Sequence, residues 1–383
     1  MSGRPGLYVH VPFCSRICPY CDFAVLADDE ARRRSYTEHL SRELQRRSEL
    51  GPFDTIYFGG GTPSLLAAEA VERILDTAPL TEDCRRFLEA NPEDVNEKTV
   101  ADWQRLGIDT LSLGVQAFDD GSLDFLGRRH RGGDAERAVE LARDGGIGTV
   151  SVDLIFGLPG QTKDDWSREL REAIRTEPDH LSCYQLTIHD ETLFGRRVRE
   201  GALIPASVDM QAELFFETYR VLEGAGYVGY EISNFAKATE FRSRHNEKYW
   251  DHTPYLGVGP SAHSFDGSVR RWNARTFQDW LRRMERDLDP VVGRERLRDE
   301  DLVLESIVLR LRMRDGLDTA RFRERFGFDL VHFNEPLIEK LCDEGLLLVS
   351  DGHLRPTLAG MAVADSLAVS FEYPRERCQT PRP

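Results

Sequence analysis

Short apolar runs alternate with longer amphipathic stretches through the first half of the chain. The runs are rich in β-branched and aromatic residues and predict strands at 7–11, 55–58, 87–90, 110–115, 150–156 and 180–188. The stretches between them predict helices at about 31–49, 66–78, 95–106, 133–144 and 163–175. Strands that alternate with helices form a parallel sheet, because each crossover helix returns the chain to the same end. The predicted fold class is α/β.

Two of the predicted helices have N-cap signals. Thr162 is followed three residues later by Asp165, as in a capping box, and Ser64 after Pro63 suits the N-cap of the helix at 66–78. The residues suited to chemistry stand at strand ends and in the loops that follow. This placement favours an open or partial (β/α)6 barrel over a Rossmann sheet, since barrel enzymes build their sites at the carboxyl ends of strands. We expect the barrel to span residues 1–235.

The rest of the chain has a different pattern. Helical periodicity at 300–312, 318–326 and 330–344 is followed by two short strands, 346–350 and 353–355, around the turn Asp351-Gly352. This order predicts a mainly helical, winged-helix-like domain at 297–373, joined to the barrel by a connecting region at 236–296. Without a basic recognition face it is expected to serve as a packing or lid domain. The last residues, 374–383, are predicted to be disordered.

Three cysteines close to the first predicted strand carry the strongest functional signal. Cys14, Cys18 and Cys21 follow the spacing C-x₃-C-x₂-C, and no fourth cysteine lies nearby. Three thiolates on one short loop can hold three corners of a cubane iron–sulfur cluster and leave the fourth iron without a protein ligand. An open iron can bind a small molecule and pass it an electron. The spacing therefore predicts a redox-active [4Fe–4S] cluster.

Other uses of these cysteines fit less well. Structural zinc takes four ligands, usually from paired C-x₂-C motifs, and His10 stands at no common zinc spacing from the three cysteines. Disulfides are disfavoured, because the sequence shows no signal peptide and the total of seven cysteines is odd. The other four are scattered and predicted to be ordinary thiols: Cys84, Cys183, Cys342 and Cys378.

Charge and hydropathy exclude several classes of partner. The net charge of −16 argues against broad contact with nucleic acid or an anionic membrane, both of which favour basic surfaces. No run approaches the roughly 18 apolar residues of an integral membrane segment. An oxygen-sensitive cluster also needs a reducing compartment, so the expected location is cytoplasmic.

Polar residues at the other strand ends suit a ligand with amino-acid and nucleoside parts. Gly59-Gly60-Gly61-Thr62-Pro63 follows the second strand, where glycines let the backbone approach a ligand closely, although a triple glycine is also a plain turn. Glu89 and Gln116 end the third and fourth strands. Asp153 lies inside the fifth, where an unpartnered carboxylate is costly. It is expected to contact ligand hydroxyls or Arg128; a structural salt bridge to a barrel arginine is the alternative.

The cysteine spacing is the signature of radical S-adenosylmethionine (SAM) proteins, which this chain resembles. In that superfamily SAM chelates the open iron, and reduction splits it into methionine and a deoxyadenosyl radical. Along nearly its whole length the chain resembles the coproporphyrinogen dehydrogenase (HemN-type) group. By motif, the SAM contacts of that group fall on Tyr8, Tyr20, Gly60, Gly61, Thr62, Glu89, Gln116, Arg128 and Asp153. The last three match positions that touch a second SAM in the dehydrogenases.

Two branches share this scaffold: porphyrinogen dehydrogenases, which decarboxylate the propionates of coproporphyrinogen III, and heme chaperones, which pass heme to an acceptor protein. Phe23 stands where the dehydrogenase motif has a fourth cysteine, and only thirteen residues precede Cys14, fewer than in the dehydrogenases. The segment His245-Asn246-Glu247-Lys248-Tyr249-Trp250 matches the H-N-x-x-Y-W motif of the chaperones. The resemblance therefore implies a heme chaperone with an electron donor such as a flavodoxin or ferredoxin. The dehydrogenase is the alternative, and an RNA-modifying enzyme is disfavoured by the acidic charge.

The H-N-x-x-Y-W motif offers groups that suit heme. His245 could ligate the iron, and Tyr249 and Trp250 could stack on the porphyrin. Lys248, with Arg242 or Arg244, could pair with propionates. The alternative is that the histidine and the aromatics anchor the junction between the barrel and the C-terminal region. His263 is a second candidate ligand, whereas the Cys18-Pro19 pair is discounted because the cluster needs Cys18.

Overall fold

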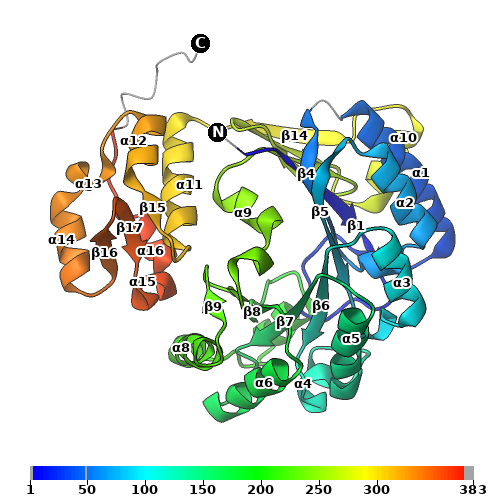
Figure 1. The fold of residues 1–383 in the computed structure, drawn as a ribbon, viewed down its shortest axis with the longest axis horizontal. Coiled ribbons are helices and arrows are strands. Elements are labelled where there is room, and N and C mark those ends of the chain that lie inside the picture. The colour runs from blue at the N-terminus through cyan, green and yellow to red at the C-terminus, as the bar shows by residue number, and fades with distance from the viewer. Residues whose placement is uncertain (1–2, 48–49, 375–383) are drawn as a thin grey trace.

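The computed structural model describes residues 3–47 and 50–374 of the chain, so all of the predicted disordered tail except Pro374 lies outside the described residues. Six parallel strands form a curved sheet in chain order (Figure 1). They are β1 (Gly6–Val11), β4 (Phe53–Gly60), β5 (Leu80–Ala90), β6 (Thr110–Gln116), β7 (Thr149–Phe156) and β8 (His180–Gln185). Since every crossover is helical, this arrangement confirms the predicted partial (β/α)6 barrel.

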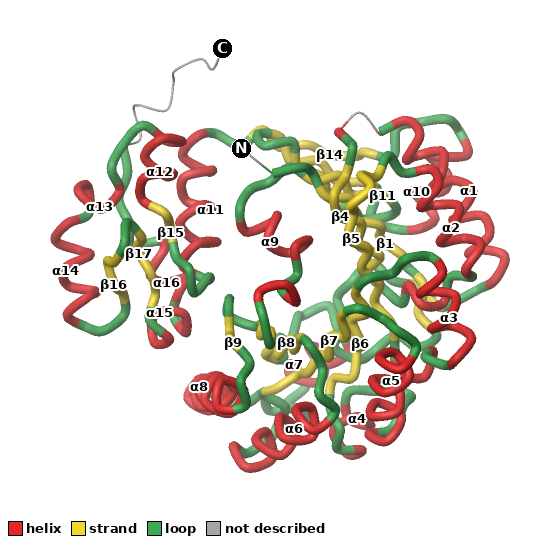
Figure 2. Tube along the Cα trace, viewed as in Figure 1, coloured by secondary structure: helices red, strands yellow, loops and turns green. Residues whose placement is uncertain are grey.

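Helices cover the convex face of this sheet (Figure 2). They are α1 (Glu30–Arg46), α2 (Ala68–Thr77), α3 (Glu97–Arg105), α4 (Asp120–Phe125), α5 (Gly132–Asp144), α6 (Lys163–Arg175) and α8 (Val208–Gly224). The short helix α7 (Leu193–Arg199) instead packs beside the cysteine loop, where the Phe194 N–H donates to the Pro19 carbonyl at 3.0 Å. Alternation along the strands explains the layering. In β1, Leu7, Val9 and Val11 are fully buried in the core, whereas Tyr8 and His10 project to the other face, into the barrel. The barrel interior is thus more polar than its outer layer.

The two predicted helix starts have different outcomes. Thr162 caps α6 in a capping box with Asp165, as predicted. The prediction for Ser64 is wrong, because that residue lies in a 3₁₀ turn (Pro63–Leu65) and Ala67 precedes α2. The Ser64 hydroxyl instead donates to the carboxylate of Asp94, in a second 3₁₀ turn (Pro92–Asp94), at 2.7 Å. This bond ties together the loops that follow β4 and β5.

The region predicted to connect the two domains also extends the barrel sheet. β11 (Tyr255–Val258) runs parallel to β1 on its outer edge, and β12 (His263–Phe265), β13 (Val269–Asn273) and β14 (Val291–Arg296) continue the sheet in antiparallel order. The other edge is closed by β10 (Asn234–Ala236) and β9 (Val228–Gly229). A short pair, β2 (Phe13–Cys14) and β3 (Leu26–Ala27), frames the cysteine loop.

A buried carboxylate joins this extension to the barrel. Glu43 of α1 is fully buried and accepts hydrogen bonds from the Gly259 backbone (3.0 Å), the Asn273 amide (2.7 Å) and the Trp280 indole (2.8 Å). Arg47, the residue directly after α1, lies 3.0 Å from the same carboxylate. Trp280 belongs to α10 (Phe277–Glu285), so one side chain links helices α1 and α10 to the extension. Burial of a charge is tolerated here because each oxygen is hydrogen-bonded.

The C-terminal unit has its own hydrophobic cluster, which includes Val303, Phe322 and Leu354. Its elements are α11 (Asp299–Leu311), β15 (Leu317–Asp318), α12 (Thr319–Phe326), α13 (Leu330–Phe333), α14 (Glu335–Asp343), β16 (Leu347–Ser350), β17 (His353–Pro356), α15 (Leu358–Ala362) and α16 (Ala364–Ala368). The helix predicted at 330–344 is divided at Asn334, because Pro336 has no N–H to continue the earlier helix and instead starts a new one.

One short helix lies on the concave side of the sheet, between the barrel and the C-terminal unit (Figure 1). It is α9 (Arg244–Trp250), preceded by a 3₁₀ turn (Thr239–Phe241), and it contains the H-N-x-x-Y-W motif. α9 contacts β4 near the beginning of that strand, where Thr55 bonds to His245. Among the described residues, no helix is long and apolar enough to cross a bilayer.

Candidate functional site

A cavity of about 460 Å³, here the cluster cavity, opens at the carboxyl ends of the barrel strands. Its volume lies in the range of small-molecule sites. Most of the predicted cluster and SAM residues line it: Cys14, Cys18, Cys21, Tyr20, Gly60, Gly61, Thr62, Glu89, Gln116, Arg128 and Asp153. Only Tyr8 among them faces a different cavity. The strand ends thus bring together residues that are up to 139 positions apart, from Cys14 to Asp153.

The three cysteines do not converge as ligands of one ion. Among the described residues, no group of three or more His, Cys, Asp and Glu side chains could hold a single metal ion. A cubane cluster puts each thiolate on a different iron, so its ligands stand further apart. Burial raises the pKa of Cys14 to about 11 and also raises that of Cys21, so both are thiols until a metal binds. The donor set fits the cluster better than zinc.

The triple glycine is needed for the shape of the cavity wall. Gly60 has φ +114°, which L-residues rarely adopt, and a Cβ there would lie 2.6 Å from the His10 ring. A Cβ on Gly61 would lie 2.6 Å from the Phe13 carbonyl oxygen and 3.0 Å from Cys14 Sγ. Only a chain without side chains can pass this close to the cysteine loop. The loop after β4 therefore lies directly against the first cysteine.

Glu89 is the buried acid of the cavity. Its carboxylate accepts hydrogen bonds from the Tyr57 hydroxyl at 2.8 Å and from the Gly60 backbone N–H at 3.1 Å. Burial, opposed by the Tyr57 bond and aided by the nearby Asp153 carboxylate, raises the pKa of Glu89 to about 7. A bound cation would favour the ionised form, so this position suits an ammonium group.

Glu89→Gln tests this carboxyl group. Its folded-state pKa of about 7 lies above the ordinary 4.5, so between these pH values the folded protein keeps a proton that the unfolded chain has released. The free energy of unfolding of the cluster-free protein should therefore fall by about 2–3 kcal/mol as the pH rises through this interval. In Glu89→Gln this decrease in the free energy of unfolding should disappear, as measured by urea unfolding at pH 5 and pH 8.

Glu82→Gln is the matched control, because Glu82 is an exposed glutamate on the same strand, β5. It should leave the pH dependence as in the unmodified chain. An unchanged pH dependence in Glu89→Gln would show that Glu89 ionises normally in the folded protein.

Asp153 and Arg128 do not pair with each other. Asp153 accepts hydrogen bonds from the Ser112 hydroxyl at 3.1 and 3.2 Å, and burial raises its pKa to about 6. Arg128 donates to the Gly114 carbonyl at 2.8 Å, to Asn91 and, at 3.6 Å, to Cys18 Sγ. Within the described part of the chain Asp153 forms no bond to Arg128 and no salt bridge to another arginine, so contact with ligand hydroxyls is the part of the prediction that stays open. Arg128 instead places a positive charge beside the cysteine loop.

Several cavity residues were not expected from the sequence. Asn91, Ser112 and Tyr184 line the same cavity as Glu89 and Asp153. Asn91 follows Glu89 by two positions, so its place after a strand end was the one usable signal. Gln116 has φ +68°, a conformation uncommon outside glycine, and this local strain lies at the cavity, where such residues often serve a site.

His245 lies near the opposite, amino-terminal end of the strands. It is almost fully buried: Nδ1 is 2.9 Å from the Thr55 hydroxyl and Nε2 is 2.9 Å from the Tyr249 hydroxyl. Its ring lies 5.2 Å from that of Tyr57, and burial lowers its pKa to about 3. Both ring nitrogens thus have partners. Iron ligation by His245 stays a prediction, and it would require one of these hydrogen bonds to break.

The other residues around the motif are also engaged. Lys248 and Arg244 pair with Asp54 at 2.7 and 3.3 Å, and Arg242 pairs with Asp315 at 3.2 Å. Pairing of these cations with propionates therefore stays a prediction, and it would require these ion pairs to open. Trp250 faces a cavity of about 530 Å³ between α9 and the C-terminal helices, whereas Tyr249 faces the cavity that also contains Tyr8. The motif side chains do not enclose one common space.

The cavity beside Tyr8, here the lateral cavity, has a volume of about 780 Å³. It lies over the extension of the sheet, and its lining includes Tyr8, His10, Tyr249 and His263. His10 is bonded at both nitrogens, to the Tyr8 hydroxyl (3.2 Å) and the Ala24 carbonyl (3.1 Å). The lateral and cluster cavities share three lining residues: Asp22, Phe23 and Gly60.

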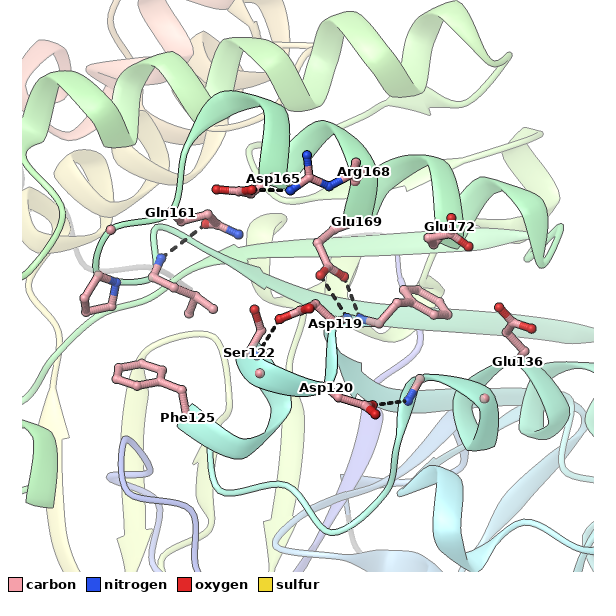
Figure 3. A pocket seen from close by; sticks show the side chains of 17 residues that line it. Asp119, Asp120, Ser122, Phe125, Glu136, Gln161, Asp165, Arg168, Glu169 and Glu172 are labelled. Atoms are coloured by element: carbon pink, nitrogen blue, oxygen red, sulfur yellow. Dashed lines mark hydrogen bonds and ion pairs between the residues drawn. The ribbon is translucent and has the colours of Figure 1, made fainter.

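A further hollow of about 710 Å³ lies on the outer side of the barrel, between α4, α5 and α6 (Figure 3). Its carboxylates mostly serve the backbone. Glu169 accepts from the N–H groups of Phe118 and Asp119, and Asp119 caps α4 (Figure 3). These acids stabilise loop and helix ends, and none of the predicted site residues lines this hollow.

Comparison with known proteins places the chain in a family. A model of the radical SAM superfamily matches residues 8–173, and a model of the HemN C-terminal domain matches residues 297–363. The heme chaperone HemW of Bacillus subtilis is 30% identical over 372 residues, which cover 95% of this chain and 98% of that protein. The chain belongs to the HemN/HemW group of the radical SAM superfamily.

Further similar proteins support the same family assignment. The bovine mitochondrial protein called radical S-adenosyl methionine domain-containing protein 1 is 34% identical, over 97% of this chain and 88% of its own length. Escherichia coli HemW is 39% identical, over 67% of this chain and 69% of its own. The solved structure of E. coli coproporphyrinogen III oxidase (HemN) has a TM-score of 0.82 at 20% identity, over 96% of this chain and 89% of that one. It shows the shared fold.

Membership of the radical SAM superfamily implies a [4Fe–4S] cluster and SAM. The cluster cavity fits that pair, because three thiols, a close-approaching glycine loop and a buried acid surround one space. Arg128 beside Cys18 supplies a positive charge near the thiolates.

Proposed function

We propose that this protein is a heme chaperone that binds a [4Fe–4S] cluster, SAM and heme and passes the heme to an acceptor protein. The observation that carries the proposal is the similarity, at 30–39% identity, to proteins called heme chaperone HemW. Phe23 in place of a fourth cysteine and the motif at 245–250 support the same branch. Its expected protein partners are a heme acceptor and an electron donor such as a flavodoxin or ferredoxin.

In this proposal Cys14, Cys18 and Cys21 hold the cluster at the carboxyl end of β1. The cluster, when bound, supplies an open iron for the amino and carboxylate groups of SAM and the electron that can cleave it. Glu89 binds the ammonium group of SAM, as its buried carboxylate suits. Gly60, Gly61 and Thr62 contribute backbone groups along the methionine part.

The remaining SAM contacts line the other side of the cavity. Asp153, held by Ser112, is available for ligand hydroxyls, and Tyr20 and Gln116 provide further polar contacts. Arg128, bonded to the Gly114 carbonyl and lying beside Cys18, offsets negative charge at the cluster. Tyr8 lines the lateral cavity and reaches SAM from that side, past Gly60, which both cavities share.

A direct assay separates the chaperone from the porphyrinogen dehydrogenase. The protein is reconstituted anaerobically and supplied with SAM, a reductant and either coproporphyrinogen III or hemin. We expect a stoichiometric Soret band with hemin, transfer of heme to an apo-cytochrome, and no protoporphyrinogen IX. Formation of protoporphyrinogen IX at the rate of a dehydrogenase would overturn the proposal. Failure of the protein to bind a stoichiometric amount of hemin would also overturn it.

A further inference from the structure

Resting on the proposed function, we propose that heme binds in the lateral cavity, with His263 rather than His245 as the iron ligand. Four histidines line the cavities described above: His10, His189, His252 and His263. The first three have hydrogen-bond or ion-pair partners. Among the described residues, neither ring nitrogen of His263 has a hydrogen-bond partner, and its side chain is exposed to the cavity.

The sheet extension positions this histidine. His263 of β12 stands opposite Trp272 of β13, which stands opposite Gly293 of β14, so the three lie in a row on one face. The Trp272 ring is stacked beside the imidazole, with centroids 6.0 Å apart and an interplanar angle of 27°. A Cβ on Gly293 would lie 2.2 Å from the Trp272 ring, so only glycine lets the indole lie there. Trp272 therefore supports one face of the His263 ring.

The lining suits a large flat aromatic ligand. Tyr8, Phe23, Tyr249 and Tyr255 supply aromatic surface, and the volume of about 780 Å³ is the larger of the two neighbouring cavities. Partial burial and the Arg270 charge lower the pKa of His263, which keeps its imidazole neutral and able to ligate iron.

The charges at the rim leave one cation for a propionate. Arg270 pairs with Glu305 at 2.9 Å and lies 3.9 Å from Glu295, whereas Arg275 forms no ion pair within the described part of the chain. Asp22, the remaining acid of the lining, pairs with His189 at 3.4 Å. Arg275 is therefore the group placed to bind a propionate.

The position of the cavity relates heme to the cluster. Phe23 is 63% exposed and lines both cavities, at the position where dehydrogenases have a further cysteine. Heme in the lateral cavity would thus contact the wall of the cluster cavity without occupying the space for SAM. Heme and SAM can then bind at the same time in neighbouring cavities. A heme site around the buried His245, at the other end of the strands, would not lie next to the SAM site.

The test compares His263→Ala with His245→Ala by hemin titration, monitored through the Soret band and the low-temperature electron paramagnetic resonance of the ferric iron. His263→Ala should weaken binding tenfold or more and lose the imidazole-ligated spectrum, and free imidazole should restore that spectrum. His263 is exposed, so its replacement should leave thermal unfolding unchanged. A spectrum and affinity unchanged in His263→Ala would overturn the inference, while leaving the chaperone proposal in place. No hemin binding to the unmodified protein would overturn both.

Gly293→Ala probes the same site without touching the ligand. The added methyl group must displace the Trp272 ring, so hemin affinity should fall severalfold while the iron remains histidine-ligated. Gly133→Ala on α5 is the matched control, since a Cβ there meets nothing within 4 Å. Equal hemin affinity in these two variants would contradict a role for Trp272.

Discussion

A Cys21→Ser variant should assemble no [4Fe–4S] cluster while it still folds and still binds hemin. Serine is a poor iron ligand at neutral pH, and two remaining thiolates cannot hold a cubane with one open iron. Bound iron should fall from about four atoms per chain to less than about one. The brown charge-transfer absorption and the spectral change on adding SAM should disappear together, as measured by iron analysis and absorption spectroscopy under anaerobic conditions.

Cys342→Ser is the matched control. Cys342 is a half-buried thiol of the C-terminal unit, far along the chain from the cluster loop, and its loss should leave iron content and the response to SAM unchanged. A SAM-responsive cluster in Cys21→Ser would show that Cys21 is not a ligand. Loss of hemin binding together with the cluster would show that the cluster and lateral cavities are not separable.

The Glu43→Ala variant should lose about 3–5 kcal/mol of unfolding free energy. Removal of this buried carboxylate leaves the Trp280 indole and the Gly259 N–H without their partner, and Arg47 loses its nearest acid. Since these groups join α1 and α10 to the sheet extension, the extension should loosen first. Urea unfolding followed by tryptophan fluorescence measures the effect, because Trp280 lies in the affected contact.

Glu38→Ala provides the comparison on the same helix. Glu38 forms an exposed ion pair with Arg42, at 2.6 Å, so its loss should cost less than about 1 kcal/mol. Similar losses in the two variants would mean that Glu43 contributes no more than a surface charge. Because the extension also forms the wall that contains His263, Glu43→Ala should in addition lower hemin affinity.

The strand-and-helix order of the barrel was predictable because it depends on local patterns. Apolar runs and amphipathic stretches located all six parallel strands, and the Thr162 cap located the start of α6 to the residue. Ser64 shows the limit of such signals. Its hydroxyl bonds to Asp94, thirty residues away, and a long-range partner of this kind leaves no local pattern.

The position of the 236–296 region at the edge of the barrel sheet could not be predicted, because it depends on pairing between strands far apart in the sequence. β11 joins β1 across some 250 positions of sequence, and its short run of residues gives no sign of which strand edge is available. The ion pairs of Arg244 and Lys248 with Asp54 could not be predicted for the same reason, since Asp54 belongs to β4. Charge pairs between distant elements depend on the assembled fold.

By itself the sequence predicted the chemistry at the amino-terminal loop, because the spacing of Cys14, Cys18 and Cys21 indicates a cluster with one iron that has no protein ligand. It left open whether the glycines at the end of β4 form a plain turn or a close approach. Only the structure shows the close approach, since a Cβ on Gly61 would lie 2.6 Å from the Phe13 carbonyl oxygen and 3.0 Å from Cys14 Sγ. Which histidine is free to bind iron was decided by the tertiary structure alone. Thr55 of β4 and Tyr249 of α9 bond to the two ring nitrogens of His245, whereas those of His263 have no partner among the described residues. No sequence motif indicates this difference.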